Sequence, residues 1–186
     1  MIERLFPDKE VDKVESIGLK DLMDQGIKGV IIDIDNTISE WKLDPTENVA
    51  AWLEMLKSNG IKICLVSNNR RIRAEKLSRK LEVHAIYSAF KPRRKAFISA
   101  ITLMGIKASE TAVVGDQIFT DIYGGNRLNM FTIYVRPIAD RDHWFVKIKR
   151  PFEKYVLAKF RVRDFEQKER RLMWKVSSGE RKLKKH

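Results

Sequence analysis

The stretch GVIIDIDNT, residues 29–37, decides the fold. Residues 29–34 form a largely apolar run that begins at a glycine, which is typical of a strand buried on both faces. Strands of this kind belong to parallel sheets that helices cover on both sides. Asp33, Asp35 and Thr37 are spaced two residues apart, so on an extended backbone their side chains share one face.

Strands and helices alternate along the rest of the chain. After an irregular or helical lead-in over residues 1–28, further strands are predicted over residues 61–66, 85–87, 111–114 and 130–135. Helices are predicted over residues 46–58, 70–81, 92–104 and 118–127. The alternation predicts an α/β fold with a parallel five-stranded sheet and right-handed crossovers.

Polar side chains follow four of these strands at the carboxyl end, where open parallel sheets bind ligands. They are Asp33, Asp35 and Thr37 after the first strand, Ser67, Asn68 and Asn69 after the second, Lys91 after the third, and Asp116 and Asp121 after the fourth. Because parallel strands end at one edge of the sheet, we expect these side chains to form one site.

The residue types in this site suit the hydrolysis of a phosphomonoester. Asp33 can attack phosphorus and form an aspartyl-phosphate, while Asp35 gives a proton to the leaving alkoxide and later takes one from water. Mg²⁺, which prefers oxygen ligands, would offset the repulsion between Asp33 and Asp116, with Asp121 as a third candidate ligand. The candidate phosphate-binding residues are Thr37, Ser67, Asn68 and Lys91.

Each motif also has a simpler explanation. Acidic residues after a strand are common in turns and helix caps, and Ser67 with its two neighbouring asparagines could merely cap the next helix. Lys91 could be an ordinary surface lysine. We favour the functional interpretation because all four motifs occur in order, each at the end of a predicted strand.

The four motifs resemble those of the haloacid dehalogenase-like (HAD) superfamily, whose fold is a Rossmannoid three-layer sandwich. The resemblance implies a nucleophile at Asp33, an acid and base at Asp35, and phosphate contacts from Ser67 and Lys91. Aspartate at position 35 is typical of the phosphatases of this superfamily. The metal ligands that the resemblance implies for Mg²⁺ are Asp33, the Asp35 backbone carbonyl and Asp116, with Asp121 as a supporting carboxylate.

A closer resemblance, over roughly residues 5–160, is to the YqeG family of subfamily IIIA phosphatases. The segments that carry it are Leu5-Phe6-Pro7-Asp8, Gly29-Val30, Asp35-Asn36-Thr37 before Glu40-Trp41, Ser67-Asn68-Asn69 and Gly115-Asp116-Gln117. That family is similar to mitochondrial phosphatidylglycerophosphate phosphatases. The resemblance therefore implies phosphatidylglycerophosphate as the leading substrate and phosphatidylglycerol as the product.

The spacing of the motifs leaves no room for a cap domain. Thr37 is close in sequence to the helix predicted from about Glu47, and one helix with a short strand fills the interval from Asn69 to Lys91. A site without a cap stays open, so a large or surface-bound substrate can reach it.

The positive charge of the chain is concentrated in its C-terminal part. The net charge is +12, and residues 141–186 hold 16 Lys or Arg against 6 Asp or Glu, whereas residues 1–140 hold 21 against 19. We therefore divide the chain into a catalytic domain, residues 1–140, and a basic helical extension, residues 141–186. A helix expected from Pro151 carries one aromatic and apolar stripe. The stripe consists of Phe152, Tyr155, Val156 and Phe160.

Three roles remain open for this extension: packing on the sheet, contact with an anionic membrane, or contact with RNA. The alternatives to lipid hydrolysis are a phosphatase of nucleic-acid ends, sugar phosphates or phosphoproteins, and an RNA- or ribosome-binding module with a vestigial site. The single Cys64 excludes a disulfide framework and a four-cysteine zinc site. The chain shows no secretory signal and no membrane-spanning stretch, which predicts a cytoplasmic protein, peripheral at the inner face of the membrane if it acts on lipid.

Overall fold

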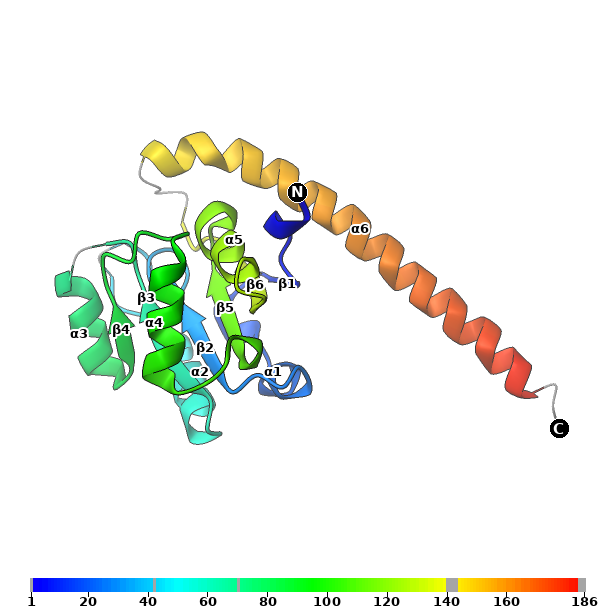
Figure 1. The fold of residues 1–186 in the computed structure, drawn as a ribbon, viewed down its shortest axis with the longest axis horizontal. Coiled ribbons are helices and arrows are strands. Elements are labelled where there is room, and N and C mark those ends of the chain that lie inside the picture. The colour runs from blue at the N-terminus through cyan, green and yellow to red at the C-terminus, as the bar shows by residue number, and fades with distance from the viewer. Residues whose placement is uncertain (1, 42, 70, 140–143, 184–186) are drawn as a thin grey trace.

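Figure 1 shows the computed structural model, which describes residues 2–41, 43–69, 71–139 and 144–183. A six-stranded parallel sheet with the order β1-β6-β5-β2-β3-β4 forms its centre. The strands are β1 (Lys9–Val11), β2 (Gly29–Ile32), β3 (Lys62–Val66), β4 (His84–Ile86), β5 (Thr111–Gly115) and β6 (Phe131–Val135). The helices are α1 (Leu19–Asp24), α2 (Glu47–Ser58), α3 (Arg71–Leu81), α4 (Arg94–Met104), α5 (Tyr123–Asn126) and α6 (Trp144–Leu183). Short 3₁₀ turns lie at Ile2–Leu5, Val14–Ser16 and Ala108–Glu110, and a π-helical turn at Ile118–Ile122.

Apolar side chains alternate between the two faces of the central strand β2, so each face has its own core. Val30 and Ile32 pack with Leu56 of α2 on one face. Ile31 packs with Phe97 of α4 on the other. Two layers of helices around one parallel sheet confirm the predicted three-layer α/β class.

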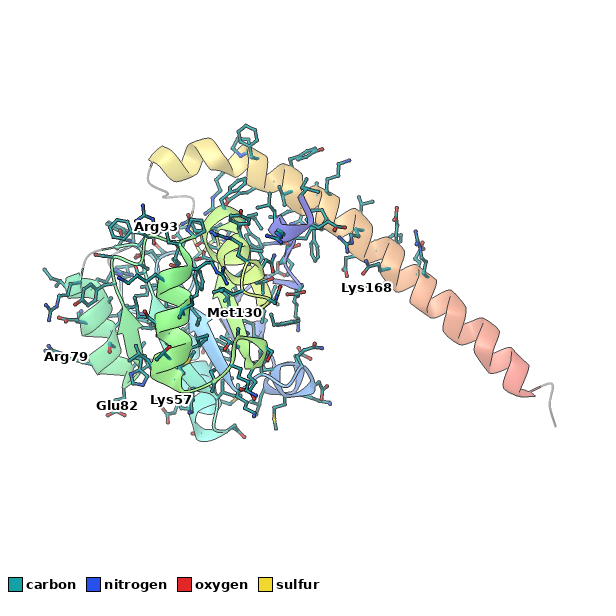
Figure 2. The ribbon with its side chains drawn as sticks, in the orientation of Figure 1. Lys57, Arg79, Glu82, Arg93, Met130 and Lys168 are labelled. Atoms are coloured by element: carbon teal, nitrogen blue, oxygen red, sulfur yellow. The ribbon has the colours of Figure 1, made fainter. Side chains whose placement is uncertain are left out.

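The strand register brings the ends of the central strands to the same level. Ile32 lies beside Leu65 of β3 and beside Val114 of β5. The residues that follow these three strands therefore emerge side by side at one edge of the sheet. Arg93 lies at that end of the molecule in Figure 2, and Lys57 and Glu82 lie at the opposite end.

The prediction of five strands was wrong by one. The additional strand, β1, is one of the two edge strands of the sheet and pairs with β6. Its three residues are Lys-Glu-Val, so two of them are charged and no apolar run marks it. An edge strand needs less apolar surface than a central one, because one of its sides is not covered by another strand.

The helix predicted over residues 92–104 begins at Arg94 instead. Pro92 lies in the turn before it, after a cis peptide bond with Lys91. The predicted helix over residues 118–127 starts as a π-helical turn before α5 begins at Tyr123. Such turns occur often at functional sites.

No cap domain interrupts the described residues. Between Thr37 and Glu47 they form turns and one isolated bridge, Asp35 to Ser39. Between Asn69 and Lys91 they hold α3 and β4. The predicted absence of a cap is thus confirmed for the part of the chain that the structure describes.

The C-terminal helix begins before the position predicted from Pro151. α6 starts at Trp144, so Pro151 lies inside it. Its first part passes over the end of the body that carries α5, and its last part extends away from the body, as Figure 1 shows. Lys168, labelled in Figure 2, lies on α6 near the point where the helix leaves the body.

The stripe predicted for α6 is divided between the body and solvent. Val156 is buried against Ile118 and Tyr134, whereas Phe152 and Tyr155 are 65% and 57% exposed. The face of α6 that contacts the body is centred on Val156 and Leu157. Phe152 and Tyr155 lie outside this contact face and are exposed to solvent. Within the described residues, none of the helices has both the length and the apolar character needed to cross a bilayer.

Candidate active site

Three carboxylates meet at the edge of the sheet where β2 and β5 end. Asp33, Asp116 and Asp121 each offer an oxygen, and these oxygens all lie within 4.8 Å of one another. All three residues are buried. The predicted convergence of the first and fourth motifs is therefore present in the structure.

The loop after β5 places two of these acids. The π-helical turn after β5 brings Asp121 back towards Gly115, and Asp121 Oδ2 accepts a hydrogen bond of 3.2 Å from Gln117 N. A Cβ atom at Gly115 would lie 2.4 Å from the carboxyl carbon of Asp121. Position 115 therefore has to be glycine for Asp121 to reach the cluster.

Lys91 places its ammonium group between two of the carboxylates. Its Nζ lies 2.5 Å from Asp33 Oδ1 and 2.6 Å from Asp121 Oδ1. The same nitrogen donates a 2.8 Å hydrogen bond to the Val66 carbonyl. The Lys91 side chain is only 3% exposed, so it is not an ordinary surface lysine.

Asn68 holds the backbone of Lys91 in place. Lys91 N donates to Asn68 Oδ1 at 2.6 Å, and Asn68 Nδ2 donates to the Lys91 carbonyl at 3.4 Å. Both ends of the amide are thus used in positioning Lys91. Binding of phosphate by Asn68 stays a prediction.

Two hydroxyl groups lie at the same edge. Thr37 Oγ1 is 3.5 Å from Asp33 Oδ2 and 3.4 Å from Asp116 Oδ1, so it sits among the carboxylates. Ser67 is buried, and its Oγ accepts a 3.0 Å hydrogen bond from Asn69 N. Phosphate contacts of both residues stay predictions.

Asp35 lies beside the cluster, and its carboxylate has different partners. Asn69 Nδ2 donates to Asp35 Oδ2 at 2.6 Å. Arg73 Nε lies 3.0 Å from Asp35 Oδ1 as a close ion pair, although the direction of its N–H does not meet hydrogen-bond geometry. Arg73 is a residue that the motif spacing did not indicate. The backbone carbonyl of Asp35 as a metal ligand stays a prediction.

Burial and mutual repulsion raise the free energy of the ionised forms of Asp33 and Asp116. The pKa of Asp33 is raised to about 7, chiefly by burial and also by the charge of Asp121, against the opposing effect of Lys91. Burial also raises the pKa of Asp116 well above its usual range, with Asp33 and Asp121 adding to the shift. Burial lowers the pKa of Lys91, but Asp121 and Asp33 raise it by more, so Lys91 stays charged.

The donor set fits a hard divalent cation. Carboxylate oxygens are the ligands that Mg²⁺ prefers, and Asp33, Asp116 and Asp121 present theirs close together. A cation there would favour the ionised form of each acid, which burial alone disfavours. These three residues are the ones that would hold the ion.

We expect the protein without divalent ions to lose stability as pH rises from about 4 to about 7. The pKa of Asp33 is 3.8 as an ordinary aspartate and about 7 in the fold, so the folded state holds its proton across this range while the unfolded state releases it. The loss, on the order of a few kcal/mol, is complete above about pH 7. Urea unfolding at a series of pH values measures it.

Asp33→Asn is the control for this pH dependence. The variant has no titrating group at position 33, so its stability should fall less between about pH 4 and pH 7. Mg²⁺ should stabilise the wild-type protein more at about pH 8 than at about pH 5, because it binds the ionised carboxylates. Equal slopes for the variant and the wild type would contradict the assignment to Asp33.

Comparisons with known proteins agree with this geometry. The family model described as haloacid dehalogenase-like hydrolase matches residues 38–129. The chain is 38% identical to the probable phosphatase YqeG of Bacillus subtilis, over 85% of this chain and 93% of that protein. It is 33% identical to the glyceraldehyde 3-phosphate phosphatase of Methanopyrus kandleri, over 60% of this chain and 55% of that protein.

One further relative has a lipid substrate in its name. The chain is 26% identical to the chloroplastic phosphatidylglycerophosphate phosphatase 1 of Chlamydomonas reinhardtii, over 83% of this chain and 62% of that protein. The strongest of these similarities spans nearly the whole length of the probable phosphatase YqeG. The chain therefore belongs to the haloacid dehalogenase-like hydrolases, as a phosphatase of the family that includes YqeG.

Proposed function

We propose that the protein is a Mg²⁺-dependent phosphomonoester hydrolase that works through an aspartyl-phosphate at Asp33. The observation that carries the proposal is the buried group of three carboxylates with Lys91 between two of them. A bound Mg²⁺ would neutralise these acids and the negative charge of the phosphoryl group. The ion would be held by Asp33, the Asp35 backbone carbonyl and Asp116, with Asp121 as a supporting carboxylate.

The residues of this chain account for each proton and bond. A carboxylate oxygen of Asp33 attacks phosphorus while the bond from phosphorus to the ester oxygen breaks. Asp35 donates its proton to the leaving alkoxide, then takes a proton from the water that attacks the aspartyl-phosphate. Inorganic phosphate leaves, and Asp33 is restored. Lys91 stabilises the charge on the phosphoryl oxygens.

Our leading substrate is phosphatidylglycerophosphate, with phosphatidylglycerol as the product. Similarity to the chloroplastic enzyme of that name supports this choice, and so does the open site. A groove of about 470 Å³ also begins beside the catalytic acid. Asn69 and Arg73 line it, and both contact Asp35.

The walls of this groove are mainly apolar, from Trp41, Leu43, Ile72 and Leu77. Trp41 is 48% exposed and Ile72 is 83% exposed, which is costly for such side chains in water. The apolar part of a lipid, or the acyl region of a membrane, would cover them. The lining also includes Lys76, which is exposed and pairs with Asp44 at 3.2 Å, and its positive charge suits an anionic lipid surface.

The outward face of α6 suits the same surface. Phe152, Tyr155, Val162 and Phe165 are each more than half exposed. Lys159 lies over the ring of Tyr155, with Nζ 5.7 Å from the ring centroid. Aromatic residues beside basic ones are typical of interfacial helices, so we place the protein in the cytoplasm, peripheral at the inner face of the membrane.

A panel of phosphomonoesters tests the substrate. We expect Mg²⁺-dependent release of phosphate from phosphatidylglycerophosphate in anionic vesicles, and slower release from soluble glyceraldehyde 3-phosphate and from the 5′ ends of nucleic acids. Ile72→Ser should lower the rate on vesicles by about 10- to 100-fold, because roughly 1.5–3 kcal/mol of apolar contact is lost. The same variant should leave release from a soluble aryl phosphate unchanged.

Ile98→Ser is the matched control, because Ile98 is an exposed isoleucine on α4, 44% accessible and outside the groove. It should change neither rate. Rapid release from a soluble substrate with none from vesicles would end the lipid proposal while leaving the phosphatase intact. Equal losses for the two variants would show that the groove is not where lipid binds.

A further inference from the structure

The C-terminal helix contacts the acidic cluster through Arg150. One guanidinium nitrogen, Nη2, lies 2.7 Å from Asp116 Oδ2, and the other, Nη1, donates a 2.9 Å hydrogen bond to the Asp116 carbonyl. Asp116 is fully buried, and the Arg150 side chain is 15% exposed. One arginine of α6 therefore holds both the carboxylate and the backbone of a residue of the cluster.

Glu153, one turn further along α6, completes the contact. Its Oε2 accepts a 3.1 Å hydrogen bond from Arg150 Nη1, and its Oε1 accepts one of 2.8 Å from Ile118 N. Ile118 opens the π-helical turn that carries Asp121. Arg150 and Glu153 thus hold the start and the middle of the loop that supplies Asp116 and Asp121.

The two contacts of Arg150 leave one oxygen of Asp116 for the cluster. Oδ2 is taken by the guanidinium, while Oδ1 lies 3.4 Å from Thr37 Oγ1 on the side of Asp33. Because the rigid guanidinium contacts both the carboxylate and the backbone carbonyl of Asp116, it restricts rotation of that side chain relative to the backbone. Partners of this kind, which hold a metal ligand without touching the metal, set how well the ligand binds.

We propose that Arg150 is a positioning residue for divalent-ion binding, that it presents Asp116 Oδ1 to the ion, and that Glu153 orients Arg150. The proposal rests on the function proposed above, in which Asp116 holds Mg²⁺. It makes α6 part of the active site, whereas the division of the chain at residues 140 and 141 stays a prediction. A helix that merely anchored the extension would not affect the ion.

The positive charge of Arg150 and its positioning of Asp116 should have opposite effects on Mg²⁺ affinity, so a binding measurement can separate them. Removing a positive charge near the site would by itself tighten the binding of Mg²⁺. Losing the orientation of Asp116 would weaken it. A positioning role therefore predicts weaker binding in a variant that has lost the cation.

The experiment is titration calorimetry of Mg²⁺ into the full-length protein, with phosphate release from an aryl phosphate measured alongside. We expect Arg150→Met to weaken Mg²⁺ binding about tenfold or more. Arg150→Lys keeps the positive charge but cannot contact both the carboxylate and the carbonyl of Asp116. Its affinity for Mg²⁺ should therefore lie between those of Arg150→Met and the wild type. Glu153→Gln should shift Mg²⁺ binding in the same direction by less.

Arg161→Met is the matched control. Arg161 also ties α6 to the body, through two hydrogen bonds of 2.9 and 2.6 Å to Glu10. Its loss should loosen the helix and leave Mg²⁺ affinity unchanged. An equal effect of Arg161→Met and Arg150→Met would mean that α6 acts only as a brace.

Other outcomes also decide the proposal. Unchanged or tighter Mg²⁺ binding in Arg150→Met, or full recovery in Arg150→Lys, would overturn it. If Arg150→Met does not fold, the affinities of Arg150→Lys and Glu153→Gln still give the answer, since both must fall below wild type. A wild-type protein that binds Mg²⁺ but releases no phosphate would defeat the proposed function instead, and the comparison of affinities would stand.

Discussion

Asp33→Asn is expected to abolish phosphate release, with a loss of about 10⁴-fold or more relative to the wild type. The amide has nearly the shape of the carboxylate but cannot attack phosphorus, so no aspartyl-phosphate forms. Lys91 keeps Asp121 as a partner at 2.6 Å, so the packing around position 33 should survive. Release of phosphate from an aryl phosphate with saturating Mg²⁺ measures the loss.

Two further measurements separate the chemistry from the fold. Acid quenching during turnover should trap labelled phosphate on the wild-type protein and none on Asp33→Asn. Asp12→Asn is the control, because Asp12 is an exposed acid, 71% accessible and paired with Arg136 at 2.8 Å. Its activity should equal that of the wild type. Unchanged turnover in Asp33→Asn would remove the nucleophile from this position.

The sequence predicts the meeting of the motifs because a parallel sheet has few ways to arrange them. Buried parallel strands appear as apolar runs, and their carboxyl ends share one edge. Asp33 and Asp116 follow strands that pair directly, β2 and β5, so their approach follows from the sheet alone. The approach of Asp121 also requires that residue 115 has no side chain, because a Cβ atom there would collide with the Asp121 carboxyl group.

The contacts of Arg150 and Arg73 could not be predicted in this way. Arg150 lies 34 residues beyond Asp116 in sequence, on a helix that carries many other basic residues. Which of them enters the body depends on how α6 packs through Val156 and Leu157. Arg73 likewise lies in a highly charged helix, and its contacts with Ser39 Oγ at 2.8 Å and with the carbonyls of Glu40 and Leu43 depend on the tertiary fold.

The edge strand β1 could not be predicted for the same reason: long-range contacts stabilise it, and they leave no local sequence pattern. Its pairing with β6 is stabilised by backbone hydrogen bonds and by Asp8, whose Oδ2 accepts from Thr132 N at 2.8 Å. Neither leaves a periodic apolar pattern in residues 9–11. Elements held by long-range polar contacts are missed, while elements held by their own apolar pattern are found.

Lys91→Met is expected to be the most destabilising single substitution at the site, with a loss of about 3–5 kcal/mol in the absence of divalent ions. The ammonium group lies between Asp33 and Asp121 at 2.5 and 2.6 Å, where all three side chains are under 10% exposed. Methionine fills a similar volume but leaves the acids without a counter-charge. Urea unfolding at about pH 8 measures the loss of free energy.

Lys62→Met is the matched control, because Lys62 donates a 2.6 Å hydrogen bond to the Met104 carbonyl and has no carboxylate partner among its described contacts. It should cost about 1 kcal/mol. Phosphate release by Lys91→Met should fall at least about 10²–10³-fold, since a cation is lost from the phosphoryl group. Release by Lys62→Met should not change.

The stability loss of Lys91→Met should depend on Mg²⁺ concentration and on pH. Saturating Mg²⁺ should restore part of the lost stability, because the ion supplies positive charge to the same acids. Lowering the pH to about 5 should also restore part of it, because Asp33, whose pKa is about 7 even with Lys91 beside it, is protonated there and one of the uncompensated charges is removed. If Lys91→Met is as stable as the wild type at about pH 8 without Mg²⁺, the carboxyl groups need no counter-charge at that pH. They would then hold protons in the wild-type protein as well, even with Lys91 beside them. Asp33 would then be protonated and unable to act as a nucleophile until a divalent ion displaced the proton.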